Sequence, residues 1–279
     1  MTNVLYIHES ARMSGAENSL LALIRNLDRG GFSPLFVLPE KGGLSDELER
    51  MGVRCAAIPM PPVRALAGVR AAARAIAKVA KDAGAGIIHS NSIRTNIYGS
   101  MAGVSLHVPV IWHERNLLTG EAIDPDRLFS FLPDKIICNS KAIAARFGSG
   151  SGWPDKVRVV YNGVDTAAFS PSVSGAATRA KYGIKDKDIV IGIASRFNPD
   201  KGHETFFDAS AMILKDLPEL SGRVRLLVAG GAVFEEDRTR EQYVREYAAR
   251  RGLGGNTVFT GVVGDMPGIY AAMDLLVLS

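Results

Sequence analysis

The stretch 189-IVIGIASRFNPDKGHETFF-207 decides the fold class of this chain. Its apolar and largely β-branched first part, residues 189–195, is typical of a strand that is buried on both faces of a parallel sheet. A turn containing Pro199 follows, and Lys201 and Gly202 then precede a helix-like pattern. Strand, turn and helix in this order form part of a β/α unit, so the segment predicts an α/β protein with parallel strands.

The same alternation of short apolar segments and helix-length segments runs along the whole chain. Strands are predicted at residues 3–7, 34–38, 53–58, 86–89, 108–112, 135–139, 157–161, 189–195, 224–229, 257–262 and 275–278, with helices including 16–27, 65–80 and 239–250. Seven strands precede a Ser- and Pro-containing segment of little periodicity, and four follow it. We therefore expect two Rossmann-like, doubly wound domains, residues 1–168 and 182–279, with a linker at 169–181 and an incomplete second domain.

The composition is that of a globular protein with ample apolar residues for a core. Of the 279 residues, 47% are hydrophobic and 22% are charged. No uninterrupted apolar run reaches the roughly 18 residues that a membrane-spanning helix needs. Cys55 and Cys138 are far apart and show no metal or redox spacing. We expect a reducing, cytoplasmic location.

The basic excess lies entirely in the first part of the chain. Residues 1–170 hold 19 Lys and Arg against 15 Asp and Glu, whereas residues 171–279 hold 14 of each. This is too weak for a nucleic-acid binder, which would carry a basic stripe interleaved with aromatic residues. Within the predicted helix at 63–81, the cations Arg70, Arg74, Lys78 and Lys81 share one face. That face is either an ordinary solvated surface or a peripheral contact with anionic lipid on the inner face of the membrane.

Two cations bracket the turn of the opening stretch, five positions apart. Arg196 ends a strand and Lys201 lies just before a helix, so both can reach the crevice at the carboxyl edge of the sheet. An arginine fork and a lysine point charge near a helix N-terminus suit a diphosphate. Gly230, where "LLVAGG" ends a strand, and the glycine turn of "FTGVV" would present open backbone nearby. The alternative is a pair of surface cations beside a turn.

Polar side chains also end several strands of the first domain. His89 in "HSNSIRTN" and His113 in "WHERN" each follow a buried strand, and His8 follows the first strand similarly. With Asn91 and Asn139 they are candidates for a polar cleft, in which a histidine exchanges hydrogen bonds with a sugar hydroxyl. A structural imidazole with satisfied hydrogen bonds is the alternative for each histidine.

The remaining motifs concern anion binding and two other functional classes. Gly15 begins a predicted helix, and the backbone N–H groups at a helix start favour anions, but an ordinary helix start would show the same sequence pattern. No phosphate-binding P-loop and no G-x-G-x-x-G after a strand is present, which disfavours an NAD-dependent oxidoreductase. The acidic triplets at 124–126 and 186–188 lie in predicted loops rather than at paired strand ends, so no metal site is expected.

Taken together, these motifs resemble the retaining GT-B glycosyltransferases of group 1 and family four. The resemblance rests on "SGAENSLL", "HSNS", "WHER", "CNS", "VYNGVD", "GIASRFNPDKGHE", "LLVAGG" and "FTGVVGDMPGIYAAMDLLVLS", which occur in the family's order and cover essentially the whole chain.

The resemblance implies transfer of a sugar from a UDP-, GDP- or ADP-sugar to a glycan or lipid-linked acceptor, with retention and without a separate cofactor. It places Arg196 and Lys201 on the diphosphate, with Gly15 bringing backbone N–H groups to the same phosphates. His113 would lie near the transferred sugar, and Val262 and Val263 near the base. The setting it suggests is the synthesis of surface polysaccharides or glycolipids.

One departure from the family pattern concerns the donor site. The family carries two glutamates seven residues apart after the strand predicted at 275–278, and this chain stops at Ser279. The chain resembles a C-terminally truncated enzyme, expected to be inactive or very weak in this form. A non-catalytic module that binds a nucleotide or a sugar is the alternative function.

Overall fold

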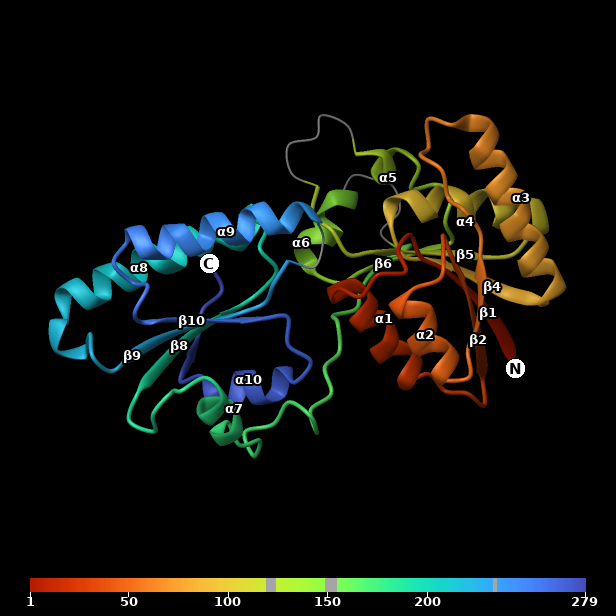
Figure 1. Ribbon diagram of the computed structural model, residues 1–279. Coiled ribbons are helices and arrows are strands. Elements are labelled where there is room, and N and C mark those ends of the chain that lie inside the picture. The colour runs from red at the N-terminus through yellow and green to blue at the C-terminus, as the bar shows by residue number, and fades with distance from the viewer. Residues whose placement is uncertain (119–123, 149–154, 233–234) are drawn as a thin grey trace. The chain divides into compact units, whose positions relative to one another are not determined.

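The computed structural model describes residues 1–118, 124–148, 155–232 and 235–279 (Figure 1). It separates into two compact units, Met1–Val164 and Asp165–Ser279, and each is described by itself. Both units consist of a parallel sheet with helices on its two faces, which confirms the predicted fold class of two Rossmann-like domains with a smaller second sheet.

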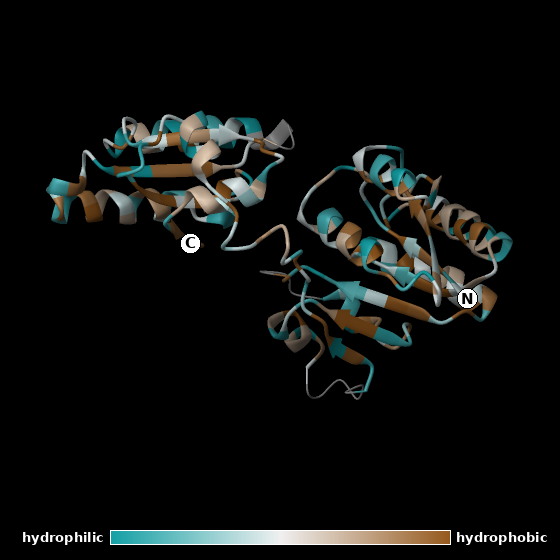
Figure 2. Ribbon diagram, turned by 90° about the horizontal axis from the view of Figure 1, so that it is seen from below, coloured by the Kyte–Doolittle hydropathy of each residue, from teal (hydrophilic) through white to brown (hydrophobic). Residues whose placement is uncertain are grey.

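The first unit contains a sheet of seven parallel strands in the order β3-β2-β1-β4-β5-β6-β7. The strands are β1 (Thr2–Ile7), β2 (Phe32–Leu38), β3 (Arg54–Ala57), β4 (Ala85–Ser90), β5 (Val110–Glu114), β6 (Lys135–Cys138) and β7 (Val157–Val159). The central strands are buried on both faces, as their continuous apolar runs predict. In Figure 2 the strands of both units are largely brown between more hydrophilic helices.

Helices cover both faces of this sheet. They are α1 (Gly15–Arg25), α2 (Gly43–Arg50), α3 (Leu66–Asp82), α4 (Ile93–Leu106), α5 (Pro125–Leu128), α6 (Lys141–Ala144) and the 3-10 turn η1 (Ala145–Phe147). Helices α1 and α2 contribute leucine and isoleucine side chains to the core on one face, and α3 and α4 pack against the other (Figure 1).

The second unit contains a four-stranded parallel sheet in the order β10-β9-β8-β11. Its strands are β8 (Ile189–Ala194), β9 (Val224–Ala229), β10 (Thr257–Gly261) and β11 (Leu275–Leu276). Its helices are α7 (Ala176–Lys181), η2 (Pro199–Lys201), α8 (His203–Asp216), η3 (Pro218–Leu220), α9 (Glu235–Arg250) and α10 (Met266–Ala272). Helices α8 and α9 lie on one face of the sheet, and α7 and α10 on the other (Figure 1).

The segment predicted as a linker, residues 169–181, differs from that expectation in its second half. Residues 176–181 form α7, which packs against α10. The Arg179 side chain donates hydrogen bonds to the carbonyl oxygens of Ala272 and Asp188 and forms an ion pair with Asp274 at 2.9 Å. These long-range contacts stabilise a short helix that has little periodicity of its own, and they make α7 part of the second unit.

Candidate functional site

The strand orders point to one edge of each sheet. In the first unit the chain passes from β1 to β2 and β3, then returns to β4 on the other side of β1. In the second unit it passes from β8 to β9 and β10 and returns to β11 on the other side of β8. Ligands of open α/β sheets bind outside the carboxyl ends of the strands at such switch points. The candidate residues are therefore those that follow β1, β4 and β5, and those that follow β8.

A histidine pair lies at the first switch point. The rings of His89 and His113, from β4 and β5, stack with centroids 5.4 Å apart, and His89 also lies against Tyr6 of β1. Nε2 of His89 is 3.3 Å from Nδ1 of His113. Both imidazoles are more than 90% buried. The structure thus brings together the two histidines that the sequence placed at neighbouring strand ends.

Arg115 completes this group, which we call the histidine cluster (His89, His113 and Arg115). Its guanidinium lies 3.3 Å from Nδ1 of His113 and donates to Ser19 of α1 at 2.8 Å and to Asn162 at 3.2 Å. Because a guanidinium can only donate, Nδ1 of His113 is the acceptor and its ring proton is on Nε2. That Nε2 is buried and has no hydrogen-bond partner among the described residues. His113 therefore holds one unused donor at this edge.

The histidine cluster keeps both imidazoles neutral. Burial, assisted by the positive charge of Arg115, lowers the pKa of His89 to about 3. Burial, Arg115 and then His89 lower the pKa of His113 to about 2. Burial also lowers the pKa of Arg115 itself to about 10, so it remains charged at neutral pH. The cluster is a neutral hydrogen-bonding pair beside one fixed cation.

The start of α1 carries a second buried polar group. Glu17 accepts hydrogen bonds from Nε2 of His8 at 2.6 Å and from the Ser14 hydroxyl at 2.5 Å. Burial acts to raise the pKa of Glu17, but these two hydrogen bonds outweigh it and the pKa is lowered. Gly15 is the first residue of α1, and a Cβ built on it would meet open space. The helix start is thus open at Gly15, while a carboxylate lies buried in its first turn.

The two asparagines of the predicted cleft connect neighbouring strand ends. The Asn91 side chain donates to the carbonyl oxygen of His89 at 3.1 Å, and its own carbonyl oxygen has no partner among the described residues. Asn139 donates its backbone N–H to Glu114 at 3.1 Å, and its side chain reaches the Arg115 carbonyl at 3.5 Å. Both asparagines hold the strand ends that carry the histidine cluster.

An ion-pair network supports the same edge from the other face of β5. Arg146 pairs with Glu114 at 3.1 Å, Asp124 at 2.9 Å and Asp126 at 3.2 Å. Asn96 donates to both Glu114 and Asp126. Burial and the neighbouring Asp126 raise the pKa of Glu114 to about 7. The acids at 124–126 are thus part of a buried network rather than simple loop acids.

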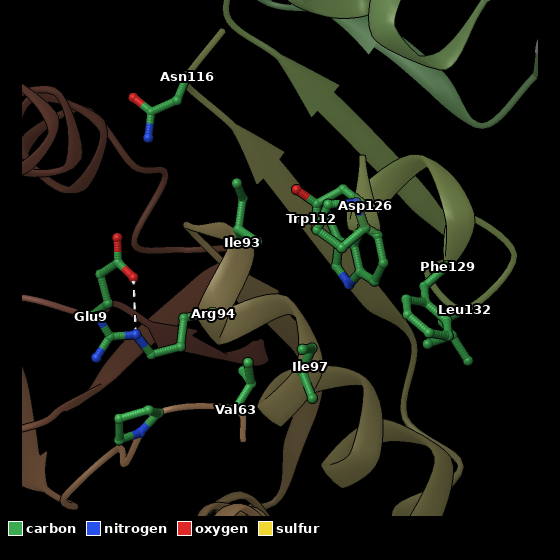
Figure 3. Close-up of a pocket in the computed structure, with 12 residues that line it drawn as sticks. Glu9, Val63, Ile93, Arg94, Ile97, Trp112, Asn116, Asp126, Phe129 and Leu132 are labelled. Carbon is green, nitrogen blue, oxygen red and sulfur yellow. Dashed lines mark ion pairs between the residues drawn. The ribbon is translucent and has the colours of Figure 1, made fainter. Parts of the chain in front are cut away.

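An apolar pocket of about 440 Å³ opens at the end of the first sheet where β4 and β5 stop (Figure 3). We call it the β4–β5 pocket. It contains the side chains of an ion pair between Glu9 and Arg94, 3.5 Å long, but its wall is mostly aliphatic and aromatic. Its lining residues are Glu9, Pro62, Val63, Ile93, Arg94, Ile97, Trp112, Asn116, Pro125, Asp126, Phe129 and Leu132. Sequence reasoning did not predict this pocket, because its residues come from five separate segments.

In the second unit, the predicted cation-bearing turn lies at the switch point. Arg196 is half-buried two residues after β8 ends, and Lys201 is exposed at the end of η2. The Asn198 side chain caps η2 by accepting from the backbone N–H of Asp200, and Gly202 has φ +63°, which favours glycine. The turn therefore presents both predicted cations at the carboxyl edge.

His203, which the sequence analysis passed over, holds this turn in place. It is fully buried at the start of α8, stacks on Phe197 with centroids 5.0 Å apart, and lies 3.3 Å from the Ser195 hydroxyl. Burial, and secondarily the charge of Arg240, lowers its pKa to about 4. It therefore acts as a neutral link between the end of β8 and the start of α8.

The neighbouring strand ends carry the predicted glycines and valines. Gly230 has φ +141°, and a Cβ there would lie 1.9 Å from the Ser195 carbonyl oxygen, so only glycine fits. Its N–H donates to Gly261 at 3.2 Å. Val262 is 70% exposed, whereas Val263 packs against a core cluster. Of the two valines, Val262 therefore has the more exposed side chain.

The basic face of α3 is exposed, as predicted. Arg70, Arg74 and Lys81 are exposed, and Lys78 pairs with Asp82 at 2.5 Å. Within the ranges that the structure describes, no helix is long and apolar enough to cross a membrane, and no group of three His, Cys, Asp or Glu could hold a metal ion.

Comparison with known proteins assigns the family. Residues 13–168 match the model of glycosyltransferase family 4, and residues 176–279 that of glycosyl transferases group 1. A D-inositol 3-phosphate glycosyltransferase of Streptomyces scabiei is 32% identical over 111 residues, which are 40% of this chain and 25% of that protein. Its counterpart in Saccharomonospora viridis is 33% identical over 128 residues, 44% of this chain and 28% of that protein. The matches thus span about a quarter of these relatives.

Solved structures share the fold. The crystal structure of Anabaena Alr3699/HepE in complex with UDP and glucose has a TM-score of 0.81 at 22% identity. The match covers 100% of this chain and 74% of that chain. A Rickettsia africae glycosyltransferase has a TM-score of 0.84 at 17% identity, covering 99% of this chain and 72% of that one. The chain belongs to the GT-B glycosyltransferases of family 4 and group 1.

Proposed function

We propose that this chain takes part in transferring a sugar from a nucleotide-sugar donor to a glycan or lipid-linked acceptor. The observation that carries the proposal is the turn at the second switch point, where Arg196 and Lys201 follow β8 and precede α8. Two cations at a helix N-terminus suit a diphosphate, and such groups stabilise the charge that develops on a leaving diphosphate. A solved relative of the same fold contains UDP, which agrees with this ligand class.

The roles of the remaining residues follow from this proposal. Gly230 and Val262 lie at strand ends beside the turn, where backbone and an exposed side chain can contact the nucleoside. In the first unit, the unused Nε2–H of His113 would donate to a sugar oxygen, and the open helix start at Gly15 would offer backbone N–H groups. We propose retention of configuration because the family resemblance is to retaining enzymes.

Nucleotide binding tests the donor role directly. We expect UDP, GDP or ADP to bind in calorimetric titration, and Lys201→Ala to weaken that binding roughly ten- to hundredfold, as loss of a charge-assisted hydrogen bond predicts. Lys215→Ala is the matched control, since Lys215 is another exposed lysine, near the far end of α8. Equal binding by Lys201→Ala and the control would remove the diphosphate role. Tight binding without release of sugar from any donor would favour a non-catalytic binding module.

A further inference from the structure

The β4–β5 pocket lies at the carboxyl ends of the strands of the first sheet. Glu9 lines the pocket two residues after β1 ends, and Asn116 lines it two residues after β5 ends. Ile93, at the start of α4, brings the segment after β4 to the same wall. The pocket therefore lies at the first switch point, where ligands of such sheets bind.

The wall of the pocket is built for an apolar ligand. Ile97, Trp112 and Leu132 form its interior, and Val63 and Phe129 are exposed to 45% and 41% although they line it. The volume of about 440 Å³ lies within the range of about 300–1,000 Å³ typical of small-molecule sites. Asp126 adds little polarity, because its oxygens bind Asn96 and Arg146.

Exposed apolar side chains continue from the pocket onto the surface. Leu128 and Phe131, exposed to 61% and 55%, flank Phe129 in sequence, and Leu66 lies three residues after Val63. A set of exposed large apolar side chains around an apolar pocket is typical of a binding site rather than of plain surface.

Two arginines lie in or beside the pocket. The acids that line it are Glu9 and Asp126, and Asp126 is already paired with Arg146. Arg64 is exposed next to Val63, and Arg94 lies in the pocket wall. The pair between Arg94 and Glu9 is 3.5 Å long and solvent-accessible, so it costs little to exchange for another anion. Figure 3 shows this pair at one end of the pocket and Phe129 and Leu132 at the other.

We propose that the β4–β5 pocket binds an alkyl or prenyl phosphate, with the hydrocarbon chain against Trp112 and Phe129 and the phosphate at Arg94. The proposal identifies the acceptor of the glycosyl transfer as a lipid-linked molecule. Calling this ligand an acceptor rests on the proposed function. The phosphate end then lies at Arg94, beside Glu9, and the hydrocarbon chain extends from it towards Phe129 and Leu132.

Quenching of Trp112 fluorescence tests the proposal. Trp112 lines the pocket, and Trp153→Phe removes the other tryptophan. Terminally brominated hexyl, octyl and decyl phosphates, used below their micelle-forming concentrations, should quench Trp112 saturably. Each two-carbon extension should lower Kd roughly tenfold, because each buried methylene adds a similar increment of apolar burial.

Three variants separate the parts of the proposal. Val63→Ser with Phe129→Ser should raise the Kd of the decyl phosphate at least about tenfold, whereas Val104→Ser, at an equally apolar and 65% exposed site on α4, should leave it unchanged. Arg94→Gln should weaken binding of the phosphate but not of a neutral brominated decyl glucoside.

The proposal is overturned by a Kd that does not depend on chain length, or by pocket variants that match Val104→Ser. Equal binding of the glucoside and the phosphate would show that the pocket does not require an anionic head group, which rules out that part of the proposal. Because the readout is binding, it is independent of transfer. If nucleotide binding fails the Lys201 test while quenching behaves as expected, the proposed function is wrong and the lipid site stands.

Discussion

Acidification should destabilise the first unit through its two buried histidines. His89 and His113 have a pKa of about 3 and about 2 in the folded protein, chiefly because of burial, against about 6.5 in an unfolded chain. Below pH 6.5 the unfolded state therefore binds more protons than the folded state, and the free energy of unfolding falls as the pH falls. Each histidine contributes about 1.4 kcal/mol per pH unit, so the pair contributes a loss of about 5 kcal/mol between pH 6.5 and 4.5.

Glu114 acts in the opposite direction over the same range. Its folded pKa of about 7, raised by burial and by Asp126, lies above the unfolded value, so the folded state gains a proton as the pH falls. This offsets up to about 3 kcal/mol of the histidine contribution. The histidine pair and Glu114 together therefore contribute a net loss of about 2 kcal/mol in the first unit, to be compared with the 5–15 kcal/mol of a typical domain.

Urea unfolding from pH 7 to 4.5, followed by Trp112 fluorescence in the Trp153→Phe background, measures this dependence in the first unit. The double variant His89→Gln with His113→Gln removes the two imidazoles and with them the loss of about 5 kcal/mol. The raised pKa of Glu114 should then make the stability of this variant rise, by up to about 3 kcal/mol, as the pH falls. The matched control is His107→Asn, because His107 is exposed and asparagine accepts its φ of +56°.

A parallel pH dependence in the double variant and the unsubstituted protein would refute the reasoning. It would mean that the two imidazoles are protonated in the folded state as readily as in water, and that they are not buried as the structure describes. A changed dependence in the His107→Asn control would point instead to a general effect of removing histidine.

Three further outcomes follow from the packing. Gly230→Ala should destabilise the second unit by about 2–4 kcal/mol in urea unfolding, because its Cβ would overlap a carbonyl oxygen, whereas Gly222→Ala, with open space around it, should change stability by less than about 1 kcal/mol. Arg146→Met should cost about 3–5 kcal/mol at pH 7 and less at pH 5, because the buried Glu114 and Asp126 and the half-buried Asp124 lose their cation and then take up protons. His203→Ala should cost about 3 kcal/mol in thermal unfolding, because the ring that stacks on Phe197 is lost.

The sequence predicts which strands form more reliably than it predicts the residues at which each strand begins and ends. Continuous Val, Ile and Leu runs mark strands buried on both faces, and every predicted strand is present in the structure. The sequence predicts that β5 begins at residue 108, but it begins at Val110, because Val108 donates its N–H to Gly103 and so belongs to the end of α4. That helix ends at His107 in a left-handed conformation, which a periodicity of apolar residues does not reveal.

Some contacts of the candidate site can be predicted from local sequence, whereas others join residues far apart in the chain and cannot. That His89 and His113 meet follows from adjacent parallel strands, and the sequence alone supports it. Arg115 is not among the predicted site residues, although it lies two positions after His113 and therefore on the same face of the strand, which the sequence does indicate. Its contacts with Ser19 and Asn162 join residues 96 and 47 positions apart, and no local pattern predicts them.

The low pKa of His113 also bears on the ligand contact that we propose for this residue. An imidazole with an ordinary pKa gains a proton below pH 6.5 and would place a second positive charge beside Arg115. Burial prevents this, so His113 stays neutral between pH 5 and 8 and its buried Nε2–H is unchanged over that range. The same burial that keeps His113 neutral makes the first unit less stable at acidic pH. A ligand bound through His113 should therefore keep its affinity across a pH range in which the free energy of unfolding already declines, which distinguishes a fixed hydrogen-bond donor from a titrating acid or base.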